Sequence, residues 1–279
     1  GAPSRGAVPM GWTYAPAAAA EVLPLAYQWA TSNATANDTF MAGPSGAGYT
    51  YPDRFSDDAS FADATAGMMA TAGMSLLNII GGVPSYESVQ TLAVLENVDA
   101  VLYYTYGDGY SGLRGNIAYV EGTPVIGGRA TFWGEENDGS DMLGADGIVE
   151  LLDSLPKNVS DPASYSIIPV HAWSHTYADV VEVVARLEAL GGYDVVLPEA
   201  LVQKLKANAP GSTCPMASGS WSESCLDCTV SGYGDGCLLS CGDCAGAGAS
   251  CDLSVCHEGL SLGPENTLLC ADGSTCPSS

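Results

Sequence analysis

The sequence predicts an α/β fold: a β/α barrel-like domain, complete or incomplete, followed by a small disulfide-rich β module. Three observations support this prediction. Strand-like and helical segments alternate over residues 8–210, all ten cysteines fall between Cys214 and Cys276, and 279 residues suffice for one large domain plus a module. We therefore predict one domain over residues 1–210 and a second over residues 211–279.

The predicted strands are short segments rich in β-forming residues, and the predicted helices lie between them. The strands are Asp38–Ala42, Met74–Ile80, Ala100–Tyr106, Pro124–Gly127, Ser166–Val170 and Asp194–Leu197. Five helices are Pro16–Ala30 with a kink at Pro24, Ala59–Ala72, Ser85–Leu95, Gly144–Leu155 and Pro198–Asn208. A sixth is predicted by the apolar stripe of Val180, Val183, Val184 and Leu187. This alternation implies parallel strands joined by right-handed crossovers, although a regular barrel has eight strands.

The chain is strongly acidic, with a formal net charge of −24 from 32 acidic and 8 basic residues. Such a surface repels nucleic acid and anionic lipid, so we expect neither as a partner and favour a neutral glycan. The sequence has no apolar run of about 18 residues or more, which predicts no membrane insertion. Glycosylation sequons at Asn33, Asn37 and Asn158 indicate a secreted, extracellular glycoprotein.

Residues 211–279 contain no Lys or Arg and bury little apolar surface, so they need covalent staples to fold. Ten cysteines allow five disulfides, whose pairing the sequence leaves open. They are Cys214, Cys225, Cys228, Cys237, Cys241, Cys244, Cys251, Cys256, Cys270 and Cys276. Two Cys-x-x-Cys motifs also have the spacing of zinc ligands. The sequons and the six further cysteines indicate an oxidising compartment, which favours disulfides.

The segment Gly43–Pro52, GPSGAGYTYP, combines three glycines, two prolines and two tyrosines. Glycine permits positive φ and close backbone approach, and proline fixes φ, so this is a constrained loop. Tyr49 and Tyr51 offer flat apolar faces on which a sugar ring stacks, and Asp53 and Arg54 place charge beside them. The alternative is a buried turn whose tyrosines only pack.

Residues 8–210 resemble the GxGYxYP family of putative glycoside hydrolases (C-terminal domain). The signature is Gly46-Ala47-Gly48-Tyr49-Thr50-Tyr51-Pro52, and the blocks Val8–Trp12 and Asn37–Phe40 precede it. The resemblance implies a β/α barrel, complete or incomplete, and an activity on sugars. Family members usually carry a further domain before this one, whereas this sequence begins almost at the Val8–Trp12 block.

Residues 219–270 resemble, more weakly, a single repeat of a cyanovirin-type lectin. The matching segments are Gly219–Cys225, Leu238–Cys241, Asp252-Leu253 and Leu268–Cys270. This resemblance implies a glycan-binding module with a Cys225–Cys241 bridge. The additional cysteines depart from the lectin pattern.

The chemically informative residues follow the predicted strands, and in a β/α barrel such loops gather at the active-site face. Glycoside hydrolysis needs two carboxyl groups, about 5–5.5 Å apart for retention and about 6.5–9.5 Å for inversion. The catalytic candidates are Asp53, Asp108 and Glu135. Alternatively, Asp53 caps a turn, Asp108 lies in a simple turn, and Glu135 belongs to a solvated EENDGSD loop or to a calcium site. We expect no other cofactor.

The candidate substrate-binding residues are rings that a sugar stacks on and groups that bond its hydroxyls. They are Trp12, Tyr49, Tyr51, Tyr106, Arg129, Trp133, His171, Trp173 and His175. His171 and His175, four residues apart after an apolar strand, also suit a metal-dependent carbohydrate deacetylase. The sequence contains no Walker motif, so it does not indicate a P-loop nucleotide site.

The sequence therefore predicts a secreted carbohydrate-active protein that cleaves a neutral glycan with paired carboxylates. The alternative is a non-catalytic extracellular protein, structural or glycan-binding, that retains the hydrolase scaffold and has an extracellular assembly partner.

Overall fold

The computed structural model describes residues 5–54, 58–81, 87–105, 115–134 and 142–209, together with the backbone of five short strands between residues 225 and 269. All side-chain statements below concern the first five ranges. Tyr106, Asp108 and Glu135 lie outside the described residues, and so does the EENDGSD run with its calcium alternative.

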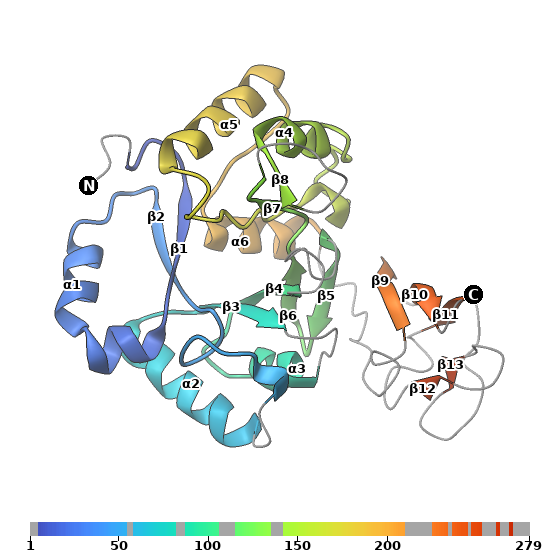
Figure 1. The fold of residues 1–279 in the computed structure, drawn as a ribbon, viewed down its shortest axis with the longest axis horizontal. Helices are drawn as coiled ribbons and strands as arrows, with labels where there is room; N and C mark the ends of the chain where they lie inside the picture. The colour runs from blue at the N-terminus through green and yellow to red at the C-terminus, as the bar shows by residue number, and fades with distance from the viewer. Residues whose placement is uncertain are drawn as a thin grey trace.

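One six-stranded sheet, ordered β1-β2-β3-β4-β6-β5, forms the centre of the fold (Figure 1). Its strands are β1 (Met10–Tyr14), β2 (Asp38–Ala42), β3 (Leu76–Gly81), β4 (Ala100–Thr105), β5 (Ile117–Val120) and β6 (Thr123–Gly127). Neighbouring strands are parallel except β5, which is antiparallel to β6. The α/β class with a parallel-rich sheet is confirmed, whereas the described strands run in open order from β1 to β5 and show no closed barrel.

Four of the predicted strands are present as β2, β3, β4 and β6, with bounds shifted by at most two residues. The prediction of a strand at Asp194–Leu197 is wrong. Ser166–Val170 is not a continuous strand, although its backbone pairs in parallel with residues 128–132, where the Arg129 N–H donates to the Ile167 carbonyl and the Phe132 N–H to the Pro169 carbonyl. Ile167 and Val170 make only isolated parallel bridges, to Gly128 and Phe132. Pro169 between them has no N–H to donate to a ladder. Asp194–Leu197 instead leads into a helix that begins at Pro198, with the Asp194 carboxylate 2.7 Å from Lys204 Nζ of that helix.

Helices cover both faces of the sheet. They are α1 (Pro24–Ser32), α2 (Asp58–Ala72), α3 (Glu87–Ala93), α4 (Ala145–Asp153), α5 (Tyr177–Leu190) and α6 (Pro198–Asn208). A π-helical turn, η1 (Ala18–Val22), precedes α1, so the predicted helix Pro16–Ala30 is divided next to the expected kink at Pro24. Each of the other five predicted helices is present, and α6 has the predicted bounds.

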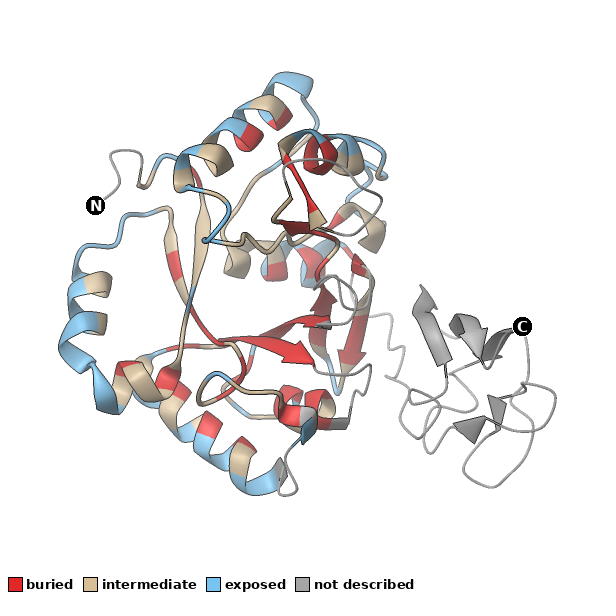
Figure 2. Ribbon diagram, in the orientation of Figure 1, coloured by how far each residue is buried: buried red, intermediate tan, exposed pale blue. Residues whose placement is uncertain are grey.

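The core has three parts. On one face of the sheet, Leu77, Ile79 and Tyr103 pack with α2 and α3, and on the other face Leu76 and Leu102 pack with α6. A third cluster joins the short strands β7 (Thr131–Phe132) and β8 (Met142–Leu143) to α4 and α5. Figure 2 shows that the most buried strands, β3, β4 and β6, lie between these helical layers.

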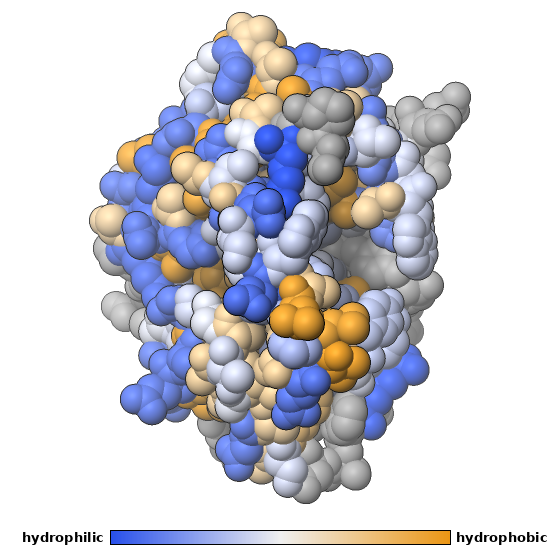
Figure 3. Space-filling view, turned by 90° about the vertical axis from the view of Figure 1, so that its left-hand side faces the viewer, coloured by the Kyte–Doolittle hydropathy of each residue, from blue (hydrophilic) through white to orange (hydrophobic). Residues whose placement is uncertain are grey.

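Helix α1 lies at the surface and has no buried residue. Val22, Leu23, Leu25 and Trp29 are all more than half exposed. Figure 3 views the molecule from the side that carries α1 and shows hydrophobic atoms gathered in one patch. Within the described residues, no helix is both long and apolar enough to span a membrane.

The cysteine-rich segment contains an antiparallel sheet ordered β11-β10-β9, with β9 at Cys225–Tyr233, β10 at Gly236–Cys244 and β11 at Ala247–Asp252. A second pair joins β12 (Ser261–Leu262) to β13 (Leu268–Leu269). This strand content agrees with the predicted β character of the segment. The domain boundary near residue 210 and the disulfides stay predictions.

Candidate functional site

The signature loop, Gly43–Pro52, contacts the C-terminal end of β3. Ser45 is fully buried, and its hydroxyl accepts a hydrogen bond from the backbone N–H of Ile80 at 2.8 Å. Gly43 has φ +149°, and a Cβ added there would lie 2.7 Å from the Asn78 side chain. The loop therefore leaves β2 through a backbone position that favours glycine and then bonds directly to the neighbouring strand.

The loop also packs on α2 through Gly46, the first glycine of the signature. Its φ is +56°, and an added Cβ would lie 2.6 Å from Phe61 Cζ and 2.7 Å from Thr65 Oγ1. Thr65 Oγ1 also accepts a hydrogen bond from the Ala47 N–H at 3.0 Å. Gly48, the second signature glycine, has no heavy atom within 4 Å of such a Cβ. Gly46 is thus required by the fold, and Gly48 is not required by packing.

The two signature tyrosines differ in their surroundings. Tyr49 is 72% exposed and presents its ring to solvent. Tyr51 is half-buried, and the Arg54 guanidinium lies 4.9 Å from its ring centroid in a cation–π contact. Asp53 lies in a single 3₁₀ turn, Pro52–Arg54, but its side chain is not among those described.

Five rings form what we call the aromatic–imidazole cluster: Phe132, Trp133, His171, Trp173 and His175. His171 lies flat on Trp133 with centroids 3.6 Å apart, and His175 lies flat on Phe132 at 3.7 Å. Trp173 meets His171 edge-on at 4.7 Å and is 90% exposed. The cluster therefore extends from the buried ring of Phe132 to the solvent-exposed indole of Trp173.

The two imidazoles have different environments. His175 Nε2 lies 3.1 Å from the Gly134 carbonyl, so Nε2 carries a proton and donates it there, while Nδ1 lies 3.9 Å from Asp179 Oδ2. His171 Nδ1 is buried and has no hydrogen-bond partner among the described residues. Burial, and then the nearby charge of His175, lowers the pKa of His171, which keeps this ring neutral at neutral pH.

The deacetylase hypothesis gains no support from this geometry. The described part of the chain contains no group of three or more His, Cys, Asp or Glu side chains arranged to hold a metal. The contact of His175 Nε2 with a backbone carbonyl also takes up one of the expected ligand atoms.

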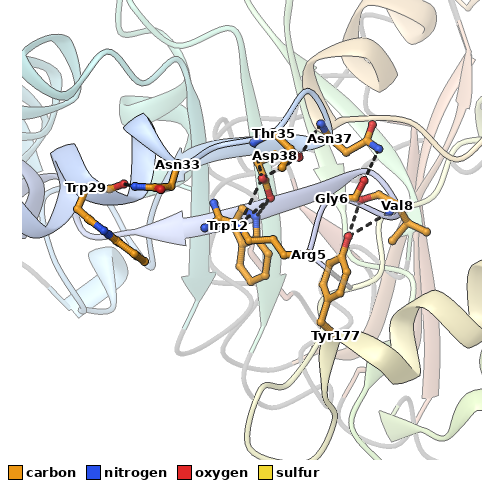
Figure 4. A network of polar contacts seen from close by, with 10 residues as sticks. All are labelled: Arg5, Gly6, Val8, Trp12, Trp29, Asn33, Thr35, Asn37, Asp38 and Tyr177. Atoms are coloured by element: carbon orange, nitrogen blue, oxygen red, sulfur yellow. Dashed lines mark hydrogen bonds and ion pairs between the residues drawn. The ribbon is translucent and has the colours of Figure 1, made fainter. Parts of the chain in front are cut away.

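Trp12 belongs to a buried polar network on β1 and β2 (Figure 4). Its indole N–H donates to Asp38 Oδ1 at 2.7 Å. Asp38 Oδ2 accepts from the Thr35 N–H at 2.8 Å and the Thr35 hydroxyl at 2.9 Å, and it pairs with Arg5 Nε at 3.3 Å. Burial alone raises the pKa of Asp38, but the bonds from Thr35 and Trp12 and the Arg5 charge outweigh it and lower the pKa. This network anchors the two strands and occupies the polar edge of Trp12.

Arg129 is also held by the fold. Its Nε donates to Ser166 Oγ at 2.8 Å, and Nη2 lies 3.0 Å from the Gly115 carbonyl. The same nitrogen lies 3.3 Å from the carbonyls of Ala163 and Tyr165. These bonds tie the segment before Ile167 to β6, which favours a structural role over the predicted contact with substrate.

A polar pair that sequence reasoning missed lies on the central strands. The Asn78 amide donates to the Tyr104 hydroxyl, and Asn78 Oδ1 is buried with no partner in the part of the chain that the structure describes. Burial raises the pKa of Tyr104, so its hydroxyl stays protonated. The signal in the sequence was Asn78, the polar residue between the apolar pairs Leu76-Leu77 and Ile79-Ile80.

Apart from Trp12 and Arg129, the described candidates fall into two groups. Tyr49 and Tyr51 belong to the loop on β3 and α2, whereas Trp133 directly follows β7, a strand of a separate two-stranded sheet, and His171, Trp173 and His175 belong to the segment before α5. We predict that Tyr51, Asp108 and His171 lie at one active-site face. This stays a prediction, because Asp108 is outside the described residues.

Comparison with known proteins identifies the family. Residues 1–206 match the family described as "GxGYxYP putative glycoside hydrolase C-terminal domain". The chain is also similar to a crystal structure described as a putative hydrolase from Bacteroides thetaiotaomicron VPI-5482, with a TM-score of 0.64 and 26% sequence identity. That match covers 74% of this chain and 40% of that chain, so this chain spans less than half of that protein's length. No curated protein matches the chain. Because the family match extends over residues 1–206 of 279, this chain belongs to the GxGYxYP putative glycoside hydrolase C-terminal domain family.

Proposed function

We propose that this protein is a secreted glycoside hydrolase that acts on a neutral glycan. The observation that carries the proposal is the aromatic–imidazole cluster, in which the 90% exposed Trp173 stands edge-on to His171 beside Trp133. A sugar ring has apolar faces and a polar rim. Exposed indole therefore suits its faces, and a neutral imidazole suits its hydroxyls.

The proposed acid pair comes from Asp53, Asp108 and Glu135. Glu135 follows Trp133 by two residues, so the chain connects it to the cluster directly. Asp53 follows the signature and lies in the turn that begins at Pro52. In this proposal one carboxylic acid protonates the leaving oxygen, and the partner carboxylate attacks the sugar or activates water. A barrel-like closure of the sheet would bring both groups to one face.

The test is release of reducing sugar from a panel of neutral glycans. Asp53→Asn, Asp108→Asn and Glu135→Gln are compared with Asp63→Asn, which changes an exposed carboxylate on α2. We expect loss of at least a hundredfold in two of the three candidates and none in the control, with unchanged melting temperatures. Full activity in all three candidate variants would overturn the assignment of the acids.

A second candidate function is non-catalytic glycan binding or extracellular assembly on the same scaffold. It is favoured by Asp38, an acid whose carboxylate is held by hydrogen bonds from Trp12 and Thr35 and by Arg5, and is therefore not free for catalysis. This alternative expects glycan affinity that depends on Trp173, without turnover of any glycan in the panel.

We also infer that the protein is secreted, glycosylated and disulfide-bonded. Support comes from Asn33 and Asn158, which are exposed in their sequons. Asn37 is half-buried, so the exposed Asn33 and Asn158 are the more accessible sites for a glycan. Mass spectrometry of the secreted protein, with site occupancy at each asparagine, tests this inference.

A further inference from the structure

The hairpin of β9 and β10 brings the two Cys-x-x-Cys motifs opposite one another. In the backbone register, Cys228 is the partner of Cys241, and Cys225 is the partner of Cys244. The register of the two strands does not change between the Tyr233–Gly236 pair and the Cys225–Cys244 pair. The two cross-strand pairs therefore belong to one continuous ladder.

Both pairs occupy positions that a disulfide can bridge. Directly opposite residues of antiparallel strands have Cα atoms about 4.5 Å apart at non-hydrogen-bonded positions and about 5.5 Å apart at hydrogen-bonded ones. A disulfide joins Cα atoms about 4.4–6.8 Å apart. Since the two pairs are three positions apart, one is of each kind, and both fall within that range.

Strand alternation also argues against a zinc site. Strand β10 shifts register against β11 between Cys241 and Cys244, but its register against β9 is the same at both cysteine pairs. Residues three positions apart in a regular strand such as β9 belong to opposite faces, so Cys225 with its partner Cys244 belongs to one face of the hairpin and Cys228 with its partner Cys241 to the other. A tetrahedral site needs four sulfurs about 2.3 Å from one metal ion, which this placement opposes. The same alternation opposes the Cys225–Cys241 bridge that the lectin resemblance implied.

We propose that the hairpin carries two disulfides, Cys225–Cys244 and Cys228–Cys241, one on each face. This proposal rests on the oxidising compartment of the proposed function. Each bridge forms when two thiols lose two protons and two electrons and one molecule of a small-molecule disulfide, such as glutathione disulfide, is reduced to two thiols. The two bridges fix the register of a segment that contains no Lys or Arg and is rich in glycine and serine.

The test is a peptide map of the intact, unreduced protein. Cleavage on the amino side of aspartate separates the cysteines of each motif, because Asp227 and Asp243 lie between them. We expect the peptide that begins at Asp227 to be linked through Cys228 to Cys241, and the peptide that ends at Leu226 to be linked through Cys225 to Cys244. Fragment spectra of each linked pair assign the bond. A Cys225–Cys241 link, or four free thiols with one bound zinc, would overturn the proposal.

Matched double variants provide an independent count. Replacing Cys225 and Cys244 together by serine should leave no free thiol after denaturation, because it removes one complete bridge. Replacing Cys225 and Cys241 together should leave two, because it removes half of each bridge. The reverse result contradicts the pairing. Glycan turnover does not enter either readout, so an inactive protein with these two bridges would refute the hydrolase proposal and leave the pairing established.

Discussion

The imidazole of His171 lies flat on the indole of Trp133, with ring centroids 3.6 Å apart and planes 4° from parallel. One face of Trp133 is therefore covered by the protein itself. Trp173, edge-on to the same imidazole and 90% exposed, is the ring of the cluster that is open to a ligand.

Trp173→Ala should weaken glycan binding about 2- to 13-fold, which corresponds to about 0.5–1.5 kcal/mol for one aromatic stacking contact. The side chain is exposed, so the melting temperature should not change. Trp29→Ala is the matched control, because Trp29 is 61% exposed on α1, outside the cluster. Titration calorimetry measures both. Equal affinities for Trp173→Ala and the unaltered protein would remove this ring from the binding surface.

Acidification should destabilise the protein through His171. Because burial lowers its pKa in the folded state, the unfolded chain binds more protons once pH falls below about 6.5, the ordinary value for histidine. Stability is therefore full above about pH 6.5 and declines as pH falls toward the folded-state pKa. His171→Phe retains a ring against Trp133 and removes the titration.

Urea midpoints at pH 7.5 and pH 5.5 test this dependence. The decrease between the two values should be smaller in His171→Phe than in the unaltered protein. Asp38 does not interfere, because its pKa is lowered from 3.8 and its contribution is lost only at more acidic pH. An identical decrease in the urea midpoint of both proteins would show that groups other than His171 cause the pH dependence.

Asp38→Asn should destabilise the fold by about 1.5–3 kcal/mol, the usual cost of losing hydrogen bonds to a buried charged group. The variant loses the Arg5 ion pair and cannot accept all the bonds that Asp38 accepts from Thr35 and Trp12. Asp146→Asn is the control. Its side chain is 94% exposed and pairs with Arg186, so it should cost less than about 1 kcal/mol. Urea unfolding gives both values, and equal costs would contradict the network's role.

The two signature glycines should respond differently to alanine. Gly46→Ala should cost about 1–3 kcal/mol, because it combines a φ of +56° with a Cβ 2.6 Å from Phe61. Gly48→Ala should change stability by less than about 0.5 kcal/mol, because the added Cβ meets nothing within 4 Å. Thermal unfolding compares them. A stability loss at Gly48 as large as at Gly46 would show that the loop packs differently.

Much of the fold follows from local patterns. Strands β2, β3, β4 and β6 are β-forming runs between turn residues, and α5 shows its apolar stripe directly. Strand β1 was missed because MGWTY has no apolar run and its positions are half-buried or, at Thr13, exposed. Strand β5 was missed because its pairing depends on the tight turn at Glu121 and Gly122, both with positive φ, which neither flanking segment reveals alone.

The candidate site residues also divide into those whose place was predictable from the sequence and those whose place was not. Trp133, His171 and His175 were identifiable because each follows an apolar segment, and the structure brings them together. Trp12 and Arg129 were predicted to bind substrate, but their partners come from positions 14 to 37 residues away in the chain. Such bonds depend on tertiary packing, which no local pattern in the sequence encodes.

The hydroxyl of Tyr177 bonds to both backbone groups of Val8, accepting from its N–H at 3.1 Å and donating to its carbonyl at 2.8 Å. A single phenol at the start of α5 thereby closes a loop of 169 residues onto the chain just before β1. Closing such a loop is entropically expensive and must wait for the intervening elements to collapse. The Tyr177–Val8 contact should accordingly form late in folding, after β1 has paired with β2, and a chain truncated before Tyr177 would lack it.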